Sequence, residues 1–378
     1  MAVYHCRQVL SGLMVLDDFP GKERWGHYLG KDAPEVGWNL LMHAVARTLD
    51  HQSQESTDCR WLRVLCLMAG DKLKLPSEEM IHELVEYPNR GDQRKVRPMI
   101  RAAEIGTHIF LDSVNDWPKR FWNQCFKRTE CWPLSFSSID AQPKLDTTLT
   151  RLKEVYAALI KHQQLTVETT AIDVKHDTVF GVCLYGLALL HELIQLGVSQ
   201  SISSRASLRT LCELVITLAY LIFKNDLDIW RSYRVFGAGQ AKLQYLKFDI
   251  EAGDTSYVDI ATLVTLANED MWEEYLPIEL GHWADSNLRK LSIDAGVKDI
   301  YDEFYAWTST YAHGHWGAVR DGVFTTCGNP LHRLHRIALE TPKKPPDIIP
   351  DACRLVDRLL SLLDQFYPNF AERVMINA

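Results

Sequence analysis

The chain has 378 residues, of which 47% are hydrophobic and 24% are charged, and its formal net charge is −8. This is ordinary globular composition, with enough length for two domains and a real hydrophobic core. The negative charge excludes a global basic field that would draw nucleic acid, so any such binding must come from a local patch.

Apolar residues recur at three- and four-residue spacing along much of the chain, which is the period of a helix. Runs of alternating β-branched residues, typical of strands, are nearly absent. We expect helices around residues 36–49, 61–68, 80–85, 96–111 and 149–160, and a last helix over 351–367. The predicted fold class is all-α: a multi-helix array with a C-terminal helical-bundle domain preceded by a smaller helical domain.

The most plausible domain boundary is the segment 131–148 (CWPLSFSSIDAQPKLDTT). It contains two prolines, several serines and no helical period, and it separates two helix-rich stretches. We therefore predict an N-terminal helical domain at 1–140, which contacts a partner or nucleic acid, and a C-terminal bundle at 149–378.

A soluble, cytoplasmic protein without membrane contact is expected from three features. The first 17 residues lack the pattern of a secretion signal. No apolar run approaches the roughly 20 residues needed to cross a bilayer, and the nearest, 211–223, is interrupted by Glu213. The nine cysteines are scattered and mostly embedded in apolar helical patterns, which is typical of reduced core residues.

The clearest basic patch lies in residues 88–101 (PNRGDQRKVRPMIR), and the candidate nucleic-acid contacts there are Arg90, Arg94, Lys95, Arg97 and Arg101. These side chains can meet the phosphates of RNA or DNA. The alternative is a solvated helix start that faces an acidic partner. Residues 117–132 also alternate aromatic and basic side chains, which indicates either base stacking or core packing beneath a basic surface.

In the second half, residues 203–226 (SSRASLRTLCELVITLAYLIFKND) predict a core helix with Ser203 or Ser204 at its amino end. Arg209 and Glu213 lie one turn apart on it. Because the later part of this helix is apolar on every side, the two charges should pair in a poorly solvated place.

A second helix is predicted in residues 298–317 (KDIYDEFYAWTSTYAHGHWG). Ile300, Phe304, Trp307 and Tyr311 should share one face, while Ser309 and His313 lie on another; Gly314 supplies a left-handed stop. His313 then falls in the last turn, where the helix dipole favours the imidazolium. That position suits a general acid or a phosphate-binding cation.

The Arg-x-x-x-Glu helix at 209–213 and the Ser-x-Tyr-x-His-Gly segment at 309–314 resemble a bacterial and archaeal family of helical proteins of unknown function, over approximately 176–320. That family is similar to abortive-infection and HEPN-like proteins, many of which are metal-independent ribonucleases or nucleotidyltransfer partners in toxin and phage-defence systems. HEPN ribonucleases carry arginine four to six residues before histidine on one helix. Here those positions hold no arginine, so Arg209 would have to substitute from another helix.

The resemblance implies a helical effector of a bacterial anti-phage or toxin-type defence module, acting as a metal-independent ribonuclease. His313 would be the acid or base, Arg209 would bind phosphate, Glu213 would orient Arg209, and Ser309 would assist by hydrogen bonding. The alternatives are a satisfied polar network that joins two core helices, in a non-enzymatic adaptor that docks a partner protein. We expect RNA or another nucleic acid, a partner protein of a defence operon, and a second copy of the chain as partners.

No metal ion or other cofactor is expected. His313, His315, His332 and His335 form a histidine-rich region, but no Cys-x-x-Cys pair or His-Glu-x-x-His motif accompanies them, which leaves a zinc site as the less favoured alternative. The chain also lacks the glycine-rich fingerprints of nucleotide hydrolysis and of dinucleotide binding.

Overall fold

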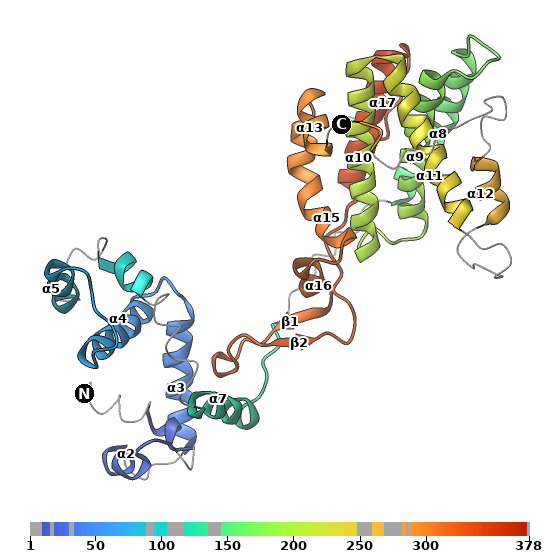
Figure 1. The fold of residues 1–378 in the computed structure, drawn as a ribbon. Helices are drawn as coiled ribbons and strands as arrows, with labels where there is room; N and C mark the ends of the chain where they lie inside the picture. Colours follow the sequence, from blue (N-terminus) through green and yellow to red (C-terminus); the bar gives the residue numbers. More distant parts are fainter. Residues whose placement is uncertain are drawn as a thin grey trace. The chain divides into compact units, whose positions relative to one another are not determined.

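The computed structural model describes residues 10–15, 19–29, 34–87, 94, 96–103, 116–134, 145–247, 259–267, 282–284 and 287–375. Contacts along the chain define two compact units. The N-unit comprises Met1–Phe136 and Phe324–Leu339, and the C-unit comprises Ser137–Val323 and Glu340–Ala378. Helices dominate both units, which confirms the predicted all-α class (Figure 1).

The N-unit is built from short helices and one small sheet. Its helical elements are η1 (Gly12–Val15), α2 (Lys22–Leu29), α3 (Pro34–Leu49), α4 (Gln54–Ala69), α5 (Glu78–Glu86), the helical residues 96–103, α7 (Trp117–Arg128) and η4 (Pro330–His332). Strands β1 (Phe324–Thr326) and β2 (Arg336–Ala338) pair antiparallel, with Thr325 opposite Ile337. Three-residue strands carry too little alternation to be visible in the sequence.

Among the described residues of the N-unit, two separate apolar clusters stabilise the fold. One gathers Phe121, Cys125 and Leu331 with residues of α3, and the other gathers Val64, Leu84 and Tyr87 with residues from 96–103. Leu331 belongs to the returning segment 324–339, which packs against α3 and α7. The predicted domain ranges, 1–140 and 149–378, contain no such return. That these ranges fold as independent domains stays a prediction.

The C-unit is a helical bundle around one large core. Its elements are α8 (Leu145–Leu165), α9 (Val174–Gln195), α10 (Ile202–Lys224), α11 (Leu227–Lys247), α12 (Ile260–Ala267), α13 (Leu288–Asp294), α14 (Lys298–Ile300), η3 (Tyr301–Tyr305), α15 (Ala306–Ala312), α16 (Trp316–Val323) and α17 (Ile349–Phe366). Helix α10 lies at the centre and contacts α9, α13, α15 and α17 (Figure 1). The predicted helices at 149–160 and 351–367 correspond to α8 and α17.

The apolar character of α10 follows from this central place. Leu211, Cys212 and Val215 of this predicted core helix are fully buried. The cap is Ser201 rather than Ser203 or Ser204, because the Ser201 side chain accepts from the Ser204 backbone N–H. By length and composition α9 and α10 could each cross a membrane, but 50% and 56% of their most apolar windows are buried inside the bundle, as core helices of a large domain are.

A π-helical turn, η3, joins α14 to α15 and changes the predicted helical phase. Ile300, Phe304 and Tyr311 are buried as expected, whereas Trp307 is 54% exposed. The prediction that Trp307 shares their face was therefore wrong. A π turn widens the helix by one residue and shifts every later side chain around its axis, and such turns often occur at functional sites.

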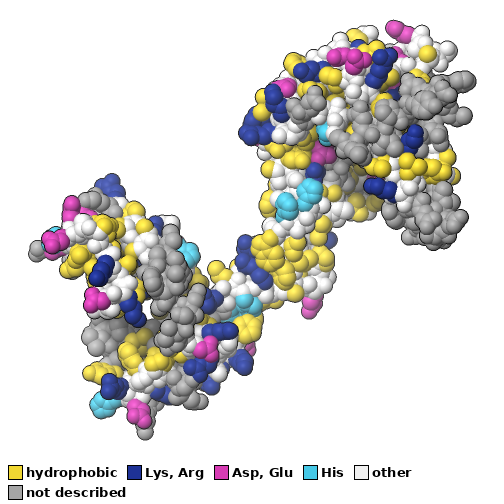
Figure 2. All heavy atoms as spheres, viewed as in Figure 1, with side chains coloured by type: hydrophobic (Ala, Val, Ile, Leu, Met, Phe, Trp, Pro, Cys, Tyr) yellow, Lys and Arg dark blue, Asp and Glu magenta, His cyan; other side chains and the backbone are white. Residues whose placement is uncertain are grey.

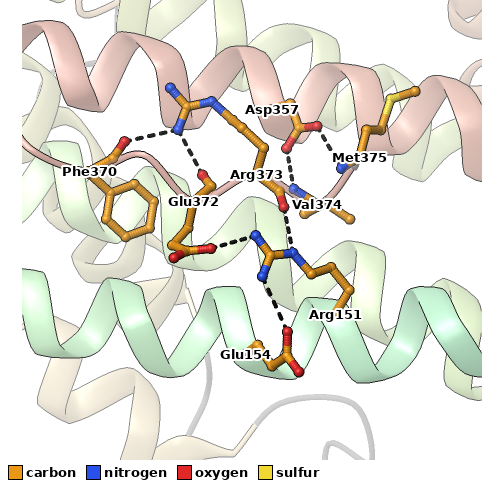
Figure 3. A network of polar contacts seen from close by, with 8 residues as sticks. All are labelled: Arg151, Glu154, Asp357, Phe370, Glu372, Arg373, Val374 and Met375. Atoms are coloured by element: carbon orange, nitrogen blue, oxygen red, sulfur yellow. Dashed lines mark hydrogen bonds and ion pairs between the residues drawn. The ribbon is translucent and has the colours of Figure 1, made fainter. Parts of the chain in front are cut away.

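The C-terminal segment is fastened to the bundle by a polar network (Figure 3). The Asp357 carboxylate on α17 accepts hydrogen bonds from the backbone N–H groups of Val374 and Met375, at 2.6 and 2.9 Å. Arg151 on α8 donates to the Arg373 carbonyl and to the Glu372 carboxylate. These contacts fix a segment without secondary structure and help seal one side of the core.

Candidate functional site

The structure brings together the arginine, glutamate and histidine that the sequence singled out. Arg209 on α10 donates through Nε to Glu213 Oε1 at 2.9 Å. Its Nη1 lies 2.9 Å from Nε2 of His313, which follows the last residue of α15. Residues 104 positions apart thus meet across a helix pair, which is the convergence that the predicted site requires.

Tyr305, which sequence reasoning missed, completes the surroundings of Arg209. Its hydroxyl accepts from Arg209 Nη2 at 3.2 Å, and its ring lies beneath the guanidinium carbon, 5.0 Å from the ring centroid. Tyr305 also stacks on Tyr301. Three groups therefore orient the guanidinium, whose side chain is only 16% exposed, so that little side-chain entropy remains to be lost on binding an anion.

The short contact between Arg209 and His313 is compatible with one tautomer of the imidazole. A guanidinium donates only, so a hydrogen bond here requires Nε2 of His313 as the acceptor, with the ring proton on Nδ1. His313 itself is exposed at the helix end. The neutral ring can accept a proton from a substrate, and Nδ1–H can donate one.

The end of α15 is shaped as predicted. Gly314 adopts φ +59° and the backbone N–H groups of His313 and Gly314 return to the carbonyls of Ser309 and Tyr311, a left-handed helix stop. Ser309 lies one turn before His313 and accepts from its backbone N–H. No described hydrogen bond joins the Ser309 hydroxyl to Arg209 or His313, so its predicted assisting role stays a prediction.

A second polar group, which was not predicted, joins α15 to α16. Tyr311 donates to Asp321 at 2.6 Å, and Lys343 donates to the other carboxylate oxygen at 2.9 Å. Burial and the Asp321 carboxylate raise the pKa of Tyr311 to about 12. Burial acts to raise the pKa of Asp321, but the hydrogen bonds from Tyr311 and Lys343 outweigh it, and the net pKa is lowered. This group stabilises the junction of α15 and α16.

The surface next to His313 is open and aromatic. His315 stacks near His313, with ring centroids 5.7 Å apart, and is exposed. Trp316 at the start of α16 is 63% exposed. Figure 2 shows histidine side chains gathered on the surface over the carboxyl end of α15. Arg209 and His313 do not line a separate cavity of about 480 Å³ in the C-unit. Asp177, Arg234 and Trp283 are among the residues that border this cavity.

The predicted basic patch is only partly described. Arg90 and Lys95 lie outside the described residues. Arg94 is exposed, while Arg97 and Arg101 are half-buried, each with its Nε buried. Arg97 donates to the Gln52 carbonyl and the Thr57 hydroxyl, each at 3.4 Å. Two of these arginines therefore take part in packing the N-unit, and the nucleic-acid role of the patch stays a prediction.

The cysteines divide into buried and exposed sets. Cys125, Cys183, Cys212 and Cys353 are core residues as predicted, and burial raises the pKa of each thiol. Cys59, Cys66 and Cys131 are exposed, so the core interpretation was wrong for them. Residue Cys6 lies outside the described residues.

One group of potential metal ligands is present among the described residues of the N-unit: Cys131, Cys327, His332 and His335. Their ligand atoms all lie within 4.8 Å of one another. The histidine-rich region predicted from the sequence is divided between the units: His332 and His335 belong to the N-unit, and His313 and His315 belong to the C-unit. The spacing Cys-x4-His-x2-His at 327–335 was the available signal, and Cys131 could not be assigned to it without the fold.

Comparison with known proteins agrees with one part of the resemblance. Residues 190–328 match the model of a family of unknown function, DUF5677. This stretch contains Arg209, Glu213, Ser309 and His313, so the similarity to a helical family of unknown function is confirmed there. No curated protein and no solved structure matches the chain.

Proposed function

We propose that the C-unit cleaves RNA without using a metal ion in the reaction, as a HEPN-like effector of a bacterial anti-phage or toxin-type defence module. The observation that supports this most is the 2.9 Å contact between Arg209 Nη1 and His313 Nε2 at an exposed helix end. A fixed cation and a titratable ring at one point can serve a single phosphate.

The chemistry follows from the two side chains. When a phosphate takes the donors of Arg209, Nε2 of His313 becomes free to accept the proton of the adjacent ribose 2′-hydroxyl. The 2′-oxygen then attacks phosphorus, and the bond to the 5′-oxygen breaks. The products are a 2′,3′-cyclic phosphate and a 5′-hydroxyl, which receives a proton from water or from an imidazolium. Arg209, oriented by Glu213 and Tyr305, stabilises the charge that builds on the phosphoryl oxygens.

The surroundings favour a single-stranded substrate. Exposed aromatic rings stack on unpaired bases with little sequence preference, and Trp316 follows directly after His315. The histidines add donors at the same edge. A duplex would need a broader basic surface than this acidic chain offers, because phosphates of both strands would have to be contacted.

Two observations favour a second candidate, a non-enzymatic adaptor that docks a partner protein or a second copy of the chain. Arg209 already has Glu213, His313 and Tyr305 as partners, as expected of a structural network. Trp307, Trp316 and Val319 expose apolar surface close by in the chain, which is the composition of an interface.

The test uses the purified full chain with labelled single-stranded RNA and no added divalent ion. His313→Ala is expected to lower the cleavage rate about 10²- to 10⁴-fold, as for loss of a general acid or base, while the midpoint of urea unfolding stays nearly unchanged because the side chain is exposed. Products of the wild-type reaction should end in 2′,3′-cyclic phosphate.

Matched controls are His191→Ala on α9 and Arg231→Ala on α11, where Arg231 has its own ion pair with Asp228. Both should cleave at the wild-type rate. Two results together would favour the adaptor over the ribonuclease. The wild-type protein would cleave none of the RNAs tested, and His313→Ala would be destabilised or would lose binding to the partner protein.

A further inference from the structure

We propose that Cys131, Cys327, His332 and His335 form a closed structural Zn²⁺ site in the N-unit. Cys131 follows α7, and the other three residues come from the returning segment about 200 positions later in the chain. The ion would join these two stretches at one point.

The distances between ligand atoms fit a tetrahedral ion. Zn–S bonds of about 2.3 Å and Zn–N bonds of about 2.0–2.1 Å place sulfur and nitrogen about 3.6 Å apart on the edge of a tetrahedron. Cys131 Sγ lies 3.5 Å from His332 Nδ1 and 3.6 Å from His335 Nε2. Cys327 Sγ lies 3.3 Å from His332 Nδ1.

The neighbouring groups orient these ligands as they do in metal sites. The Thr129 hydroxyl donates to the Cys125 carbonyl, so its oxygen accepts from Nε2–H of His332, 2.8 Å away. That contact leaves Nδ1 of His332 unprotonated toward the sulfurs, the tautomer that binds a metal. The backbone N–H of Trp132 donates to Cys327 Sγ at 3.3 Å and helps to fix the position of this sulfur.

The local backbone is held in a costly form around the site. Arg333 and Leu334, between the two histidines, both have positive φ, 51° and 57°. Two successive non-glycine residues in this region persist only where the surroundings fix them. Cys327 pairs with Pro133 in an isolated antiparallel bridge, and Gly328 N–H donates to the Trp132 carbonyl at 2.7 Å. A bound ion would supply the fixing.

The ligand set selects the metal and its role. Two thiolates and two imidazoles in tetrahedral arrangement are typical of zinc. Four protein ligands leave no position for a substrate, so the ion would stabilise the fold rather than take part in a reaction. Phe126 packs on both histidine rings, with centroids 4.9 Å away, and provides part of the apolar shell that such sites have.

The experiment measures metal in the full chain purified with reductant and without chelator. One zinc per chain is expected, with at least a fivefold loss in Cys327→Ser and none in the matched double variant Cys59→Ser/Cys66→Ser, which removes exposed thiols outside the group. Added Co²⁺ should give the visible bands of a tetrahedral ion and a thiolate-to-metal charge-transfer band.

Three further variants separate loss of a ligand from loss of the fold. His335→Cys keeps four ligands, so it should retain zinc and strengthen the Co²⁺ charge-transfer band, whereas His335→Ala should lose zinc. Thr129→Val should weaken zinc affinity about 10- to 100-fold. Protein that holds no zinc and gives no tetrahedral Co²⁺ spectrum, that loses zinc equally in the control, or whose Cys131 and Cys327 form a disulfide in the reduced preparation, would overturn the proposal.

Discussion

The N-unit and the C-unit of this chain differ in the interactions that stabilise each of them internally. The C-unit has one continuous core, in which side chains of α9, α10 and α17 such as Leu187, Leu211 and Leu359 are fully buried. Among the described residues of the N-unit, the buried apolar side chains form two clusters of five residues each. Small separate cores supply little hydrophobic stabilisation, and protein regions of this kind commonly add a metal or another cross-link. The proposed zinc site at Cys131, Cys327, His332 and His335 would supply such a cross-link to the N-unit.

The difference extends to the placement of chemistry. In the C-unit, helix α10 supplies Arg209, whose side chain is 16% exposed, and the end of α15 supplies the exposed His313. In the N-unit, the conspicuous polar residues Cys327 and His332 are themselves buried. Histidine therefore serves a proposed reaction in one unit and a proposed structural metal site in the other.

The largest expected effect is a loss of stability in the N-unit alone. Removing zinc with a chelator should cost the N-unit a large part of about 10–16 kcal/mol, the apparent binding free energy of structural zinc in small domains. Hydrogen exchange should lose protection in α7 and the β1–β2 hairpin, while α10 and α17 keep theirs. Equal loss of protection in both units, or in neither, would show that the units do not differ in this way.

The next largest effect is a loss of stability in the C-unit alone. Leu359→Ala on α17 removes a fully buried side chain that reaches Gly186 of α9 and should lower the free energy of unfolding by about 2–5 kcal/mol. Hydrogen exchange measured at increasing urea concentration reports the free energy of unfolding of each unit separately. Leu196→Ala, at a position 69% exposed, is the matched control and should change stability by less than about 0.5 kcal/mol.

The smallest effect concerns the polar group that joins α15 to α16. Tyr311→Phe removes a hydrogen bond to the Asp321 carboxylate and should cost about 1–3 kcal/mol at pH 7. Because the folded pKa of Asp321 is lowered, the stabilisation is present above its unfolded pKa and is lost as pH falls through the folded value. The difference between wild type and variant in urea unfolding should therefore shrink in acid. A difference that is constant or grows toward low pH would contradict this assignment.

Much of the fold was predictable because it rests on local pattern. The apolar stripe of α10 gave its burial, and Gly314 gave the stop after α15. The Arg209–Glu213 pairing follows from one-turn spacing in an apolar helix. The approach of His313 to Arg209 was stated as a requirement of the proposed site, and the packing of α15 on α10 meets it.

The rest could not be predicted because it depends on nonlocal or irregular geometry. The π turn at 301–305 has no sequence period of its own, so the exposure of Trp307 and the place of Tyr305 beneath Arg209 were missed. Cys131 meets Cys327 only because a segment of the chain returns to the N-unit after the C-unit helices. Pairing at that separation is not encoded in spacing, and the Cys-x4-His-x2-His run alone offers three ligands rather than four.

The most direct test of the account is a double-mutant cycle on Arg209 and His313, read in both RNA cleavage and urea unfolding. If the pair acts in chemistry, Arg209→Ala, His313→Ala and the double variant should all lose activity to a similar extent, because residues that act as a unit are strongly non-additive. Their coupling free energy in unfolding should stay below about 1 kcal/mol, because His313 is exposed and contacts at exposed sites contribute little. Additive effects on cleavage together with a coupling of about 1 kcal/mol or more in unfolding would show that the contact serves the architecture of the C-unit instead.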